Sequence, residues 1–147
     1  AWFSGWVDGE GCFSVAISKR NMGIKPFLSI GVRYDDAPLI YSVRDSLHCG
    51  VIDIERREGK KRKDGAHGRD VIRWQCNKLG ACCHILIPLF DKYPLRSKKR
   101  RDYDIWKKLS TLISCGYHLG GNRDYILSLC QELKRIRKYT LPIIPDA

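Results

Sequence analysis

Residues 3–11 read Phe3-Ser4-Gly5-Trp6-Val7-Asp8-Gly9-Glu10-Gly11, and this stretch decides the fold. Residues 1–7 are apolar and aromatic, and the Asp and Gly residues at 8–11 predict that a first helix stops there. Gly5 and Gly9 are four residues apart and therefore share one helix face. Because glycine has no Cβ atom, that face allows a second helix to approach closely, as small-residue motifs do elsewhere.

The acidic residue of this stretch, Glu10, is expected just beyond the end of the helix. If two such helices pair, two Glu10 carboxylates converge, and hard oxygen ligands of this kind suit Mg²⁺ bound beside phosphates. Two metal ions could then activate a water and stabilise the leaving oxygen of a phosphodiester. The alternative interpretation is an ordinary N-terminal core helix with a glycine-rich end.

The rest of the chain predicts alternating strand pairs and helices. Period-two alternation indicates strands at 12–18 and 27–32, joined by a turn at 21–23, and a second strand pair at 51–57 and 70–76. Helices are expected from Asp35 or Asp36 to about residue 47, and over 77–93, 97–114 and 122–139. The order αββαββα predicts an α+β fold, with one four-stranded antiparallel sheet, helices on one face and an extra C-terminal helix. Residues 1–115 are expected to form the main domain and 116–147 a helical extension of it.

Composition limits the partners of this domain. The 147 residues carry 27 Lys and Arg against 16 Asp and Glu, a net charge of +11, and 44% of them are hydrophobic. A folded and strongly basic domain of this kind favours a polyanion as its partner. The apolar run at 85–90 is short and contains Pro88, so we expect no membrane partner. The odd count of seven Cys residues indicates reduced thiols in an intracellular protein.

The opening stretch resembles the signature of the LAGLIDADG homing endonucleases. Gly5, Asp8, Glu10 and Gly11 match the signature in kind, and a strand begins at once with Cys12. The order of helices and strands also matches that family, as does the basic segment at 93–103, which reads Tyr-Pro-Leu-Arg-Ser-Lys-Lys-Arg-Arg-Asp-Tyr. The resemblance covers roughly residues 1–115 and implies a saddle-shaped, DNA-binding fold.

The resemblance also implies a catalytic centre. Glu10 takes the place of the family's essential acid, with Glu10 and Gly9 at a Mg²⁺ that Mn²⁺ or Ca²⁺ could replace in binding. The family's catalytic lysine corresponds to Arg96 or Lys98, in a register that the sequence leaves open. The second strand often ends on a polar residue, commonly Gln, where this chain has Val32.

Single-motif members of the family pair as homodimers, which implies a homodimer interface at Gly5, Trp6 and Gly9. A two-fold dimer reads a palindromic or nearly palindromic site in double-stranded DNA. The outward strand positions should face this DNA, because their side chains alternate with the core residues. They are Ser14, Ala16, Ser18 and Arg20, then Lys25, Phe27 and Ser29, then Asp53, Glu55 and Arg57, and finally Arg73 and Gln75, with Lys60, Lys61 and Arg62 in a loop suited to phosphates.

We therefore expect a metal-dependent, site-specific double-strand DNA endonuclease, a homing endonuclease in an intron, intein or free-standing context. It would act in an intracellular compartment that contains DNA. The alternatives are a non-cleaving DNA-binding regulator and an intron maturase on the same scaffold. Glu10 argues against the regulator, since a pure binder has no need of an acid beside a phosphate.

Overall fold

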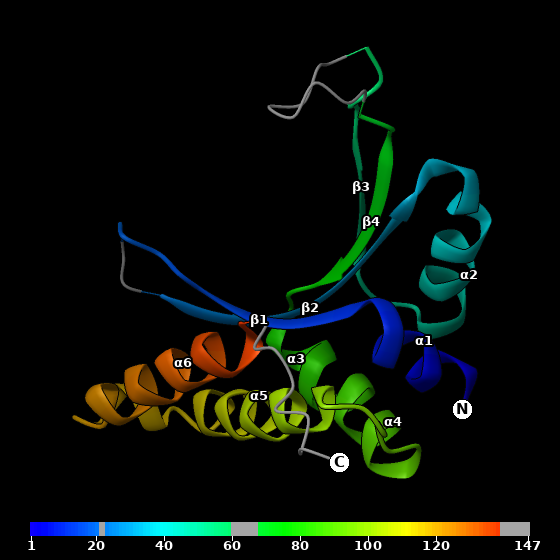
Figure 1. The fold of residues 1–147 in the computed structure, drawn as a ribbon. Coiled ribbons are helices and arrows are strands. Elements are labelled where there is room, and N and C mark those ends of the chain that lie inside the picture. The colour runs from blue at the N-terminus through cyan, green and yellow to red at the C-terminus, as the bar shows by residue number, and fades with distance from the viewer. Residues whose placement is uncertain (21–22, 60–67, 139–147) are drawn as a thin grey trace, which may run out of the picture.

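The structure is a computed structural model that describes residues 1–20, 23–59 and 68–138. Its fold confirms the predicted α+β architecture and the order of elements (Figure 1). The elements are α1 (Trp2–Glu10), β1 (Gly11–Ile17), β2 (Ile24–Arg33), the 3₁₀ turn η1 (Tyr34–Asp36), α2 (Ala37–Leu47), β3 (Val51–Glu55), β4 (Val71–Cys76), α3 (Leu79–Ala81), the π-helical η2 (Cys82–Leu86), α4 (Ile87–Lys92), α5 (Lys99–Ser114), η3 (Tyr117–Leu119) and α6 (Arg123–Arg137).

The four strands form one antiparallel sheet in the order β1-β2-β4-β3. Along β1, Phe13 and Val15 are buried while Ser14 and Ala16 face outward, so the predicted alternation holds. Figure 1 shows α2 to α6 on one side of the curved sheet, leaving its concave upper face open among the described residues. This open face is the surface that the strand alternation predicted for DNA.

An aromatic cluster joins the sheet to α4 and α5. The ring of Phe13 in β1 lies 5.5 Å from Phe90, 5.5 Å from Tyr103 and 5.2 Å from Trp106 between centroids. The indole of Trp106 also donates to the carbonyl of Phe27 in β2 at 3.1 Å. Packing and hydrogen bonding thus fix the rotation of α5 about its axis, which sets the direction of every other side chain on that helix.

The first helix differs from its prediction, because it continues through Gly9 and ends at Glu10 instead of stopping near residue 8. The prediction that Glu10 lies beyond the helix was therefore wrong. Gly11 then turns directly into β1, with its N–H bonded to the carbonyl of Val7. A Cβ atom at Gly11 would lie 2.6 Å from Val7 Cγ1 and 2.8 Å from Val7 O. Glycine is thus required where the helix meets the strand.

Two other boundaries also differ from prediction. Strand β3 ends at Glu55, so Arg57 lies beyond the strand. The helix expected over 77–93 contains a π-helical segment just before Pro88. Proline lacks an N–H and its ring clashes with the carbonyl four residues earlier, which a widened turn accommodates.

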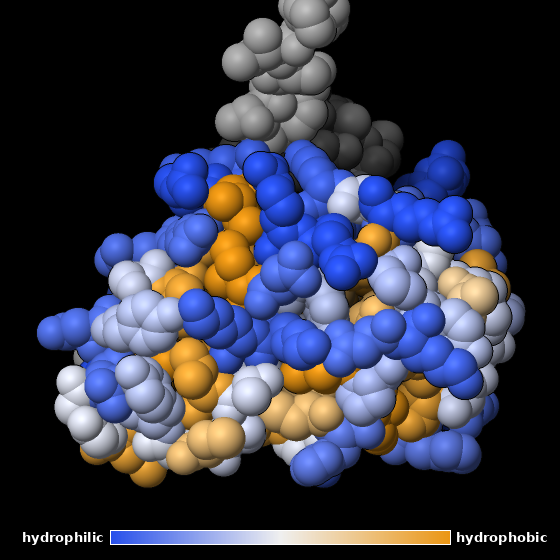
Figure 2. Space-filling model, turned by 90° about the horizontal axis from the view of Figure 1, so that it is seen from below, coloured by the Kyte–Doolittle hydropathy of each residue, from blue (hydrophilic) through white to orange (hydrophobic). Residues whose placement is uncertain are grey.

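The outer surface on the helical side is mainly hydrophilic, with hydrophobic patches between the polar side chains (Figure 2). The helices within residues 1–20, 23–59 and 68–138 all lack the length and hydrophobicity of a membrane-spanning segment. All seven cysteines are described as free thiols, and Cys82 in the π-helical segment is fully buried.

Candidate functional site

The end of α1 presents the acidic residue of the motif. Glu10 is exposed and lines an open hollow of about 390 Å³ together with Trp6, Gly31 and Val32. Val32, the residue at the family's usual polar position, therefore does lie beside Glu10. Since Glu10 is exposed and lines this hollow, its carboxylate is accessible to a ligand.

Asp8, the other acidic residue of the motif, ties α1 to the segment that precedes α5. Its carboxylate accepts hydrogen bonds from the backbone N–H of Arg96, at 3.0 and 3.1 Å, and of Ser97, at 3.0 Å. Burial opposes ionisation of Asp8, but these hydrogen bonds and the charge of Lys99 outweigh it and lower its pKa. The ionised carboxylate therefore clamps the start of α5 against the motif helix.

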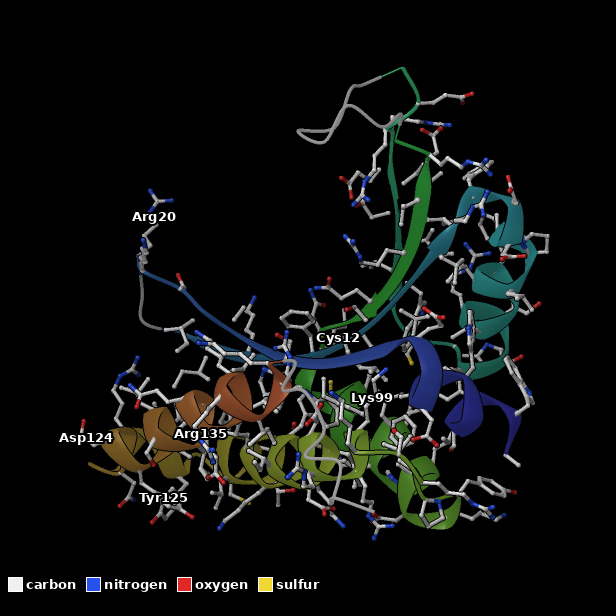
Figure 3. All side chains as sticks on the ribbon, in the orientation of Figure 1. Cys12, Arg20, Lys99, Asp124, Tyr125 and Arg135 are labelled. Carbon is white, nitrogen blue, oxygen red and sulfur yellow. The ribbon has the colours of Figure 1, made fainter. Side chains whose placement is uncertain are left out.

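Lys99, at the first residue of α5, reaches the end of α1. Its ammonium group donates to the carbonyls of Gly9, at 3.0 Å, and Val7, at 3.3 Å. Desolvation lowers the pKa of Lys99, although Glu10 and other neighbouring acidic groups raise it. Figure 3 shows Lys99 and Cys12 near the junction of α1, β1 and α5. A cation beside Glu10 is an arrangement that can orient a water and stabilise a negatively charged transition state.

The side chain that reaches the end of α1 is thus that of Lys99, which the sequence analysis did not select, and the catalytic role expected of Arg96 or Lys98 stays a prediction. The main chain of Arg96 contacts Asp8, while Arg96 itself lines a different hollow, beside Gly5. Lys98 is exposed and lies near Asp102, whose pKa is raised by desolvation. Sequence spacing held a signal for Lys99: it lies four residues before Tyr103 and seven before Trp106, so all three share the inner face of α5.

The outward strand positions lie on the open face as predicted. The pairs Ala16–Lys25, Ser14–Phe27 and Ser29–Gln75 stand side by side across the sheet, and Arg73 stands between Gly31 and Asp53. Arg20 and Ser18 lie toward the tip of the β1–β2 hairpin, and Figure 3 shows Arg20 projecting there. The hydroxyl of Ser14 also accepts a hydrogen bond of 2.7 Å from Arg137 of α6, a contact that the sequence did not indicate.

Beyond β3, the side chain of Arg57 forms ion pairs with Glu55, and the carboxylate raises the pKa of the guanidinium. Lys60, Lys61 and Arg62, predicted to contact phosphates, lie outside the described residues.

The exposed face of α1 is open at both glycines. A Cβ atom at Gly5 or Gly9 would have no heavy atom within 4 Å beyond the neighbouring backbone. Trp2 is 57% exposed on the same helix and stacks on Trp6, with 6.1 Å between the rings. This face has the room and the apolar surface needed to pack against another helix.

One chain offers few ligands for a metal ion at this centre. Glu10 supplies an accessible carboxylate, but the described residues contain no group of three or more His, Cys, Asp or Glu side chains that could hold a metal. The carbonyl of Gly9 already accepts a hydrogen bond from the Lys99 ammonium. The metal site expected at Glu10 and Gly9 therefore stays a prediction, in which water and phosphate oxygens would complete the coordination of the ion.

Comparisons with known proteins fit this geometry. The sequence model of the LAGLIDADG endonuclease family matches residues 3–110. The chain is 28% identical over 126 residues to an uncharacterised 50.9 kDa protein in ND4 intron 1 of Podospora anserina, covering 80% of this chain and 25% of that protein. It is 28% identical over 120 residues to the probable intron-encoded endonuclease 2 of Neurospora crassa, covering 80% of this chain and 23% of that protein. The chain thus spans about a quarter of the length of these relatives.

Solved structures have the same fold. The meganuclease I-AabMI bound to uncleaved DNA has a TM-score of 0.71 and 27% identity, over 88% of this chain and 42% of that one. I-SmaMI, bound to an uncleaved DNA target in the presence of calcium ions, has a TM-score of 0.76 and 24% identity. The match covers 90% of this chain and 44% of the I-SmaMI chain. The homing endonuclease I-TnaI has a TM-score of 0.72 and 26% identity, and the match covers 92% of this chain and 92% of the I-TnaI chain.

Proposed function

The chain belongs to the LAGLIDADG endonuclease family, and we propose that it hydrolyses phosphodiester bonds in both strands of a long, nearly palindromic DNA site. One observation carries the proposal: the Lys99 ammonium donates to the carbonyl of Gly9 at 3.0 Å, next to Glu10, where the motif helix joins the first strand of the sheet. A duplex lying on the open face of the sheet would place its backbone beside both charges.

The open face is suited to reading base edges in a DNA groove. Its outward positions include Arg, Gln, Ser and Lys side chains, which are the donors and acceptors that recognise bases in the major groove. The residues that we propose face the DNA are Ser14, Ala16, Ser18, Arg20, Lys25, Phe27, Ser29, Arg73 and Gln75, with Arg57 just beyond β3. The basic residues among them, with Lys60, Lys61 and Arg62, would add contacts to phosphates and make binding sensitive to salt.

Cleavage would depend on a divalent metal, which we propose is Mg²⁺ held by the Glu10 carboxylate. The metal would supply Lewis-acid stabilisation of the phosphodiester and lower the pKa of a bound water. Lys99 would hold its ammonium group near the scissile phosphate, positioned by the Asp8 clamp. Desolvation, which lowers the Lys99 pKa, also strengthens its electrostatic interaction with a nearby phosphate.

A complete active site needs a second motif helix, and we propose that a second copy of this chain supplies it. The unpaired face of α1 around Gly5, Trp6 and Gly9 would form the seam. A two-fold axis there would bring two Glu10 residues together, with one on each DNA strand. This arrangement would add a second carboxylate to the proposed metal site.

We propose that residues 1–115 form the endonuclease unit and that the remainder extends it. In support of this proposal, Ile126, Leu129 and Leu133 of α6 are buried in the same core as the strands. Both intron-associated relatives favour action in a compartment where DNA is accessible.

Incubation with a library of randomised duplexes and Mg²⁺ tests the proposed function. Cleavage by the wild type and by Glu132→Gln, an exposed control on α6, but not by Glu10→Gln is the expected result. Salt-sensitive duplex binding with no cut by any of the three would overturn the nuclease in favour of a DNA-binding regulator. Protection of structured intron RNA with no duplex preference would instead favour a maturase.

A further inference from the structure

Two arginines of the open face share one carboxylate. Glu55 at the end of β3 holds Arg57 through Nε–Oε1 and Nη2–Oε2 contacts, each of 2.8 Å. The Nη2 atom of Arg73, from the adjacent β4, lies 3.9 Å from the same Oε2 atom. These three side chains are the Glu55 cluster, and between 37% and 45% of each is exposed on the side of the sheet proposed for DNA.

A second carboxylate fixes the main chain under this cluster. Asp70 accepts hydrogen bonds from the backbone N–H of Arg57 at 2.8 Å and of Glu58 at 2.9 Å. It also binds the guanidinium of Arg56 at 3.0 Å, and that group stacks over the ring of Tyr34 at 5.5 Å. Arg57 is therefore anchored at its backbone and at its guanidinium, although it lies beyond the end of β3.

Such an arrangement suits bases better than phosphates. A free arginine on a basic surface binds any phosphate, which raises affinity without regard to sequence. A carboxylate beside the guanidinium repels phosphates, while the donors that it leaves unused can still form paired hydrogen bonds with O6 and N7 of guanine. Fixing the guanidinium also lowers the entropy lost when it docks against one base edge.

We propose that Glu55 is a specificity-determining residue that directs Arg57 and Arg73 to guanine edges in the target and away from phosphates. The inference rests on the proposed function, because it requires the concave face to bind duplex DNA. The concave face is otherwise expected to act through its positive charge. The proposed role of the acidic residue Glu55 is to suppress binding to unrelated DNA sequences.

Binding measurements on Glu55→Gln test this role. Anisotropy titrations of the full chain over a range of salt concentrations would use two duplexes of equal length: one selected from a randomised library by the wild type, and a scrambled one. We expect Glu55→Gln to bind the scrambled duplex more tightly, with a log–log salt slope steeper by about 1, the value of one added phosphate contact. The ratio of selected to scrambled affinity should fall about tenfold or more, the size of one lost base discrimination.

Reselection from the library gives a second measurement. With Glu55→Gln, the guanine preference should weaken at one or two positions of each half-site and persist elsewhere. Glu132→Gln removes the same charge from an exposed position on α6 and should leave the slope, the affinity ratio and the selected sequences unchanged.

The outcomes separate this inference from the proposed function. If the wild type prefers its selected duplex and Glu55→Gln keeps both the affinity ratio and the salt slope of Glu132→Gln, the inference is wrong and the proposed function stands. If the wild type shows no preference among duplexes, the proposed function itself fails.

Discussion

Replacing Asp8 with Asn tests how the motif helix holds the start of α5. The carboxylate accepts from two backbone N–H groups, those of Arg96 and Ser97, at 3.0 to 3.1 Å. Both N–H groups reach Oδ1, so asparagine can keep an acceptor for each, but it loses the charge that strengthens both bonds and the second contact of the Arg96 N–H with Oδ2. Hydrogen bonds to charged groups contribute about 1.5–3 kcal/mol each. Because the site is only partly buried, we expect a total loss near ~2 kcal/mol.

The loss should depend on pH in a defined direction. The pKa of Asp8 is lowered in the folded state, so its contribution is fully present above the ordinary aspartate value of about 4. It is lost as the pH falls through the lower, folded-state pKa. The stability difference between wild type and Asp8→Asn should therefore be constant from pH 7 to pH 5 and shrink toward pH 3.

Thermal unfolding followed by circular dichroism gives the measurement. A loss of ~2 kcal/mol in a chain of this size corresponds to a Tm lower by roughly 4–8 °C. Asp45→Asn is the matched control, because Asp45 pairs only with its exposed neighbour Arg44 among the contacts described, and surface pairs of this kind contribute less than about 1 kcal/mol. A Tm change equal to that of Asp45→Asn, or a difference that persists undiminished at pH 3, would refute the clamp.

Three further substitutions examine the fold, the chemistry and the seam. Gly50→Ala should destabilise the chain by at least ~2 kcal/mol in denaturant titrations, because Gly50 has a φ of +88° and a Cβ there would lie 2.1 Å from Trp74 Nε1; Gly80→Ala, where a Cβ meets nothing within 4 Å, should be neutral or slightly stabilising. Lys99→Met should reduce the rate of duplex cleavage by about 100-fold or more while duplex affinity stays nearly constant, and an unchanged rate would remove Lys99 from the chemistry. Gly5→Leu should convert a dimer to monomers in sedimentation velocity, since its side chain fills the space needed by the second helix; an intact dimer would place the seam elsewhere.

Local sequence patterns were sufficient to predict the sheet. Each strand alternates between core and outward residues, and a shift of one residue would move its apolar side chains into water. For this reason the outward positions Ser29, Arg73 and Gln75 follow from the sequence alone and are confirmed by the strand register. The match of the family model over residues 3–110 likewise confirms the resemblance that the opening motif indicated.

Boundaries and partners depended on contacts between distant segments. The signal for the end of α1 was ambiguous because glycine can end a helix or continue it, and packing of Gly11 against Val7 decided the outcome. Tertiary packing likewise decided that Lys99 is the cation near Glu10. A run of four basic residues offers several candidates, and the rotation of α5 selects one of them.

Periodicity and a short motif were therefore sufficient to predict the fold, the family and the presence of an acidic residue in the motif, because all three are local properties of the chain. Contacts made on folding were needed to show that Lys99 binds the carbonyl next to Glu10 and that Glu55 pairs with Arg57 and lies 3.9 Å from Arg73. Those arrangements depend on the rotation of a helix fixed by Trp106 and Tyr103, and on a loop held by Asp70. Neither constraint is local, since each arises from residues that are brought together only when the chain folds.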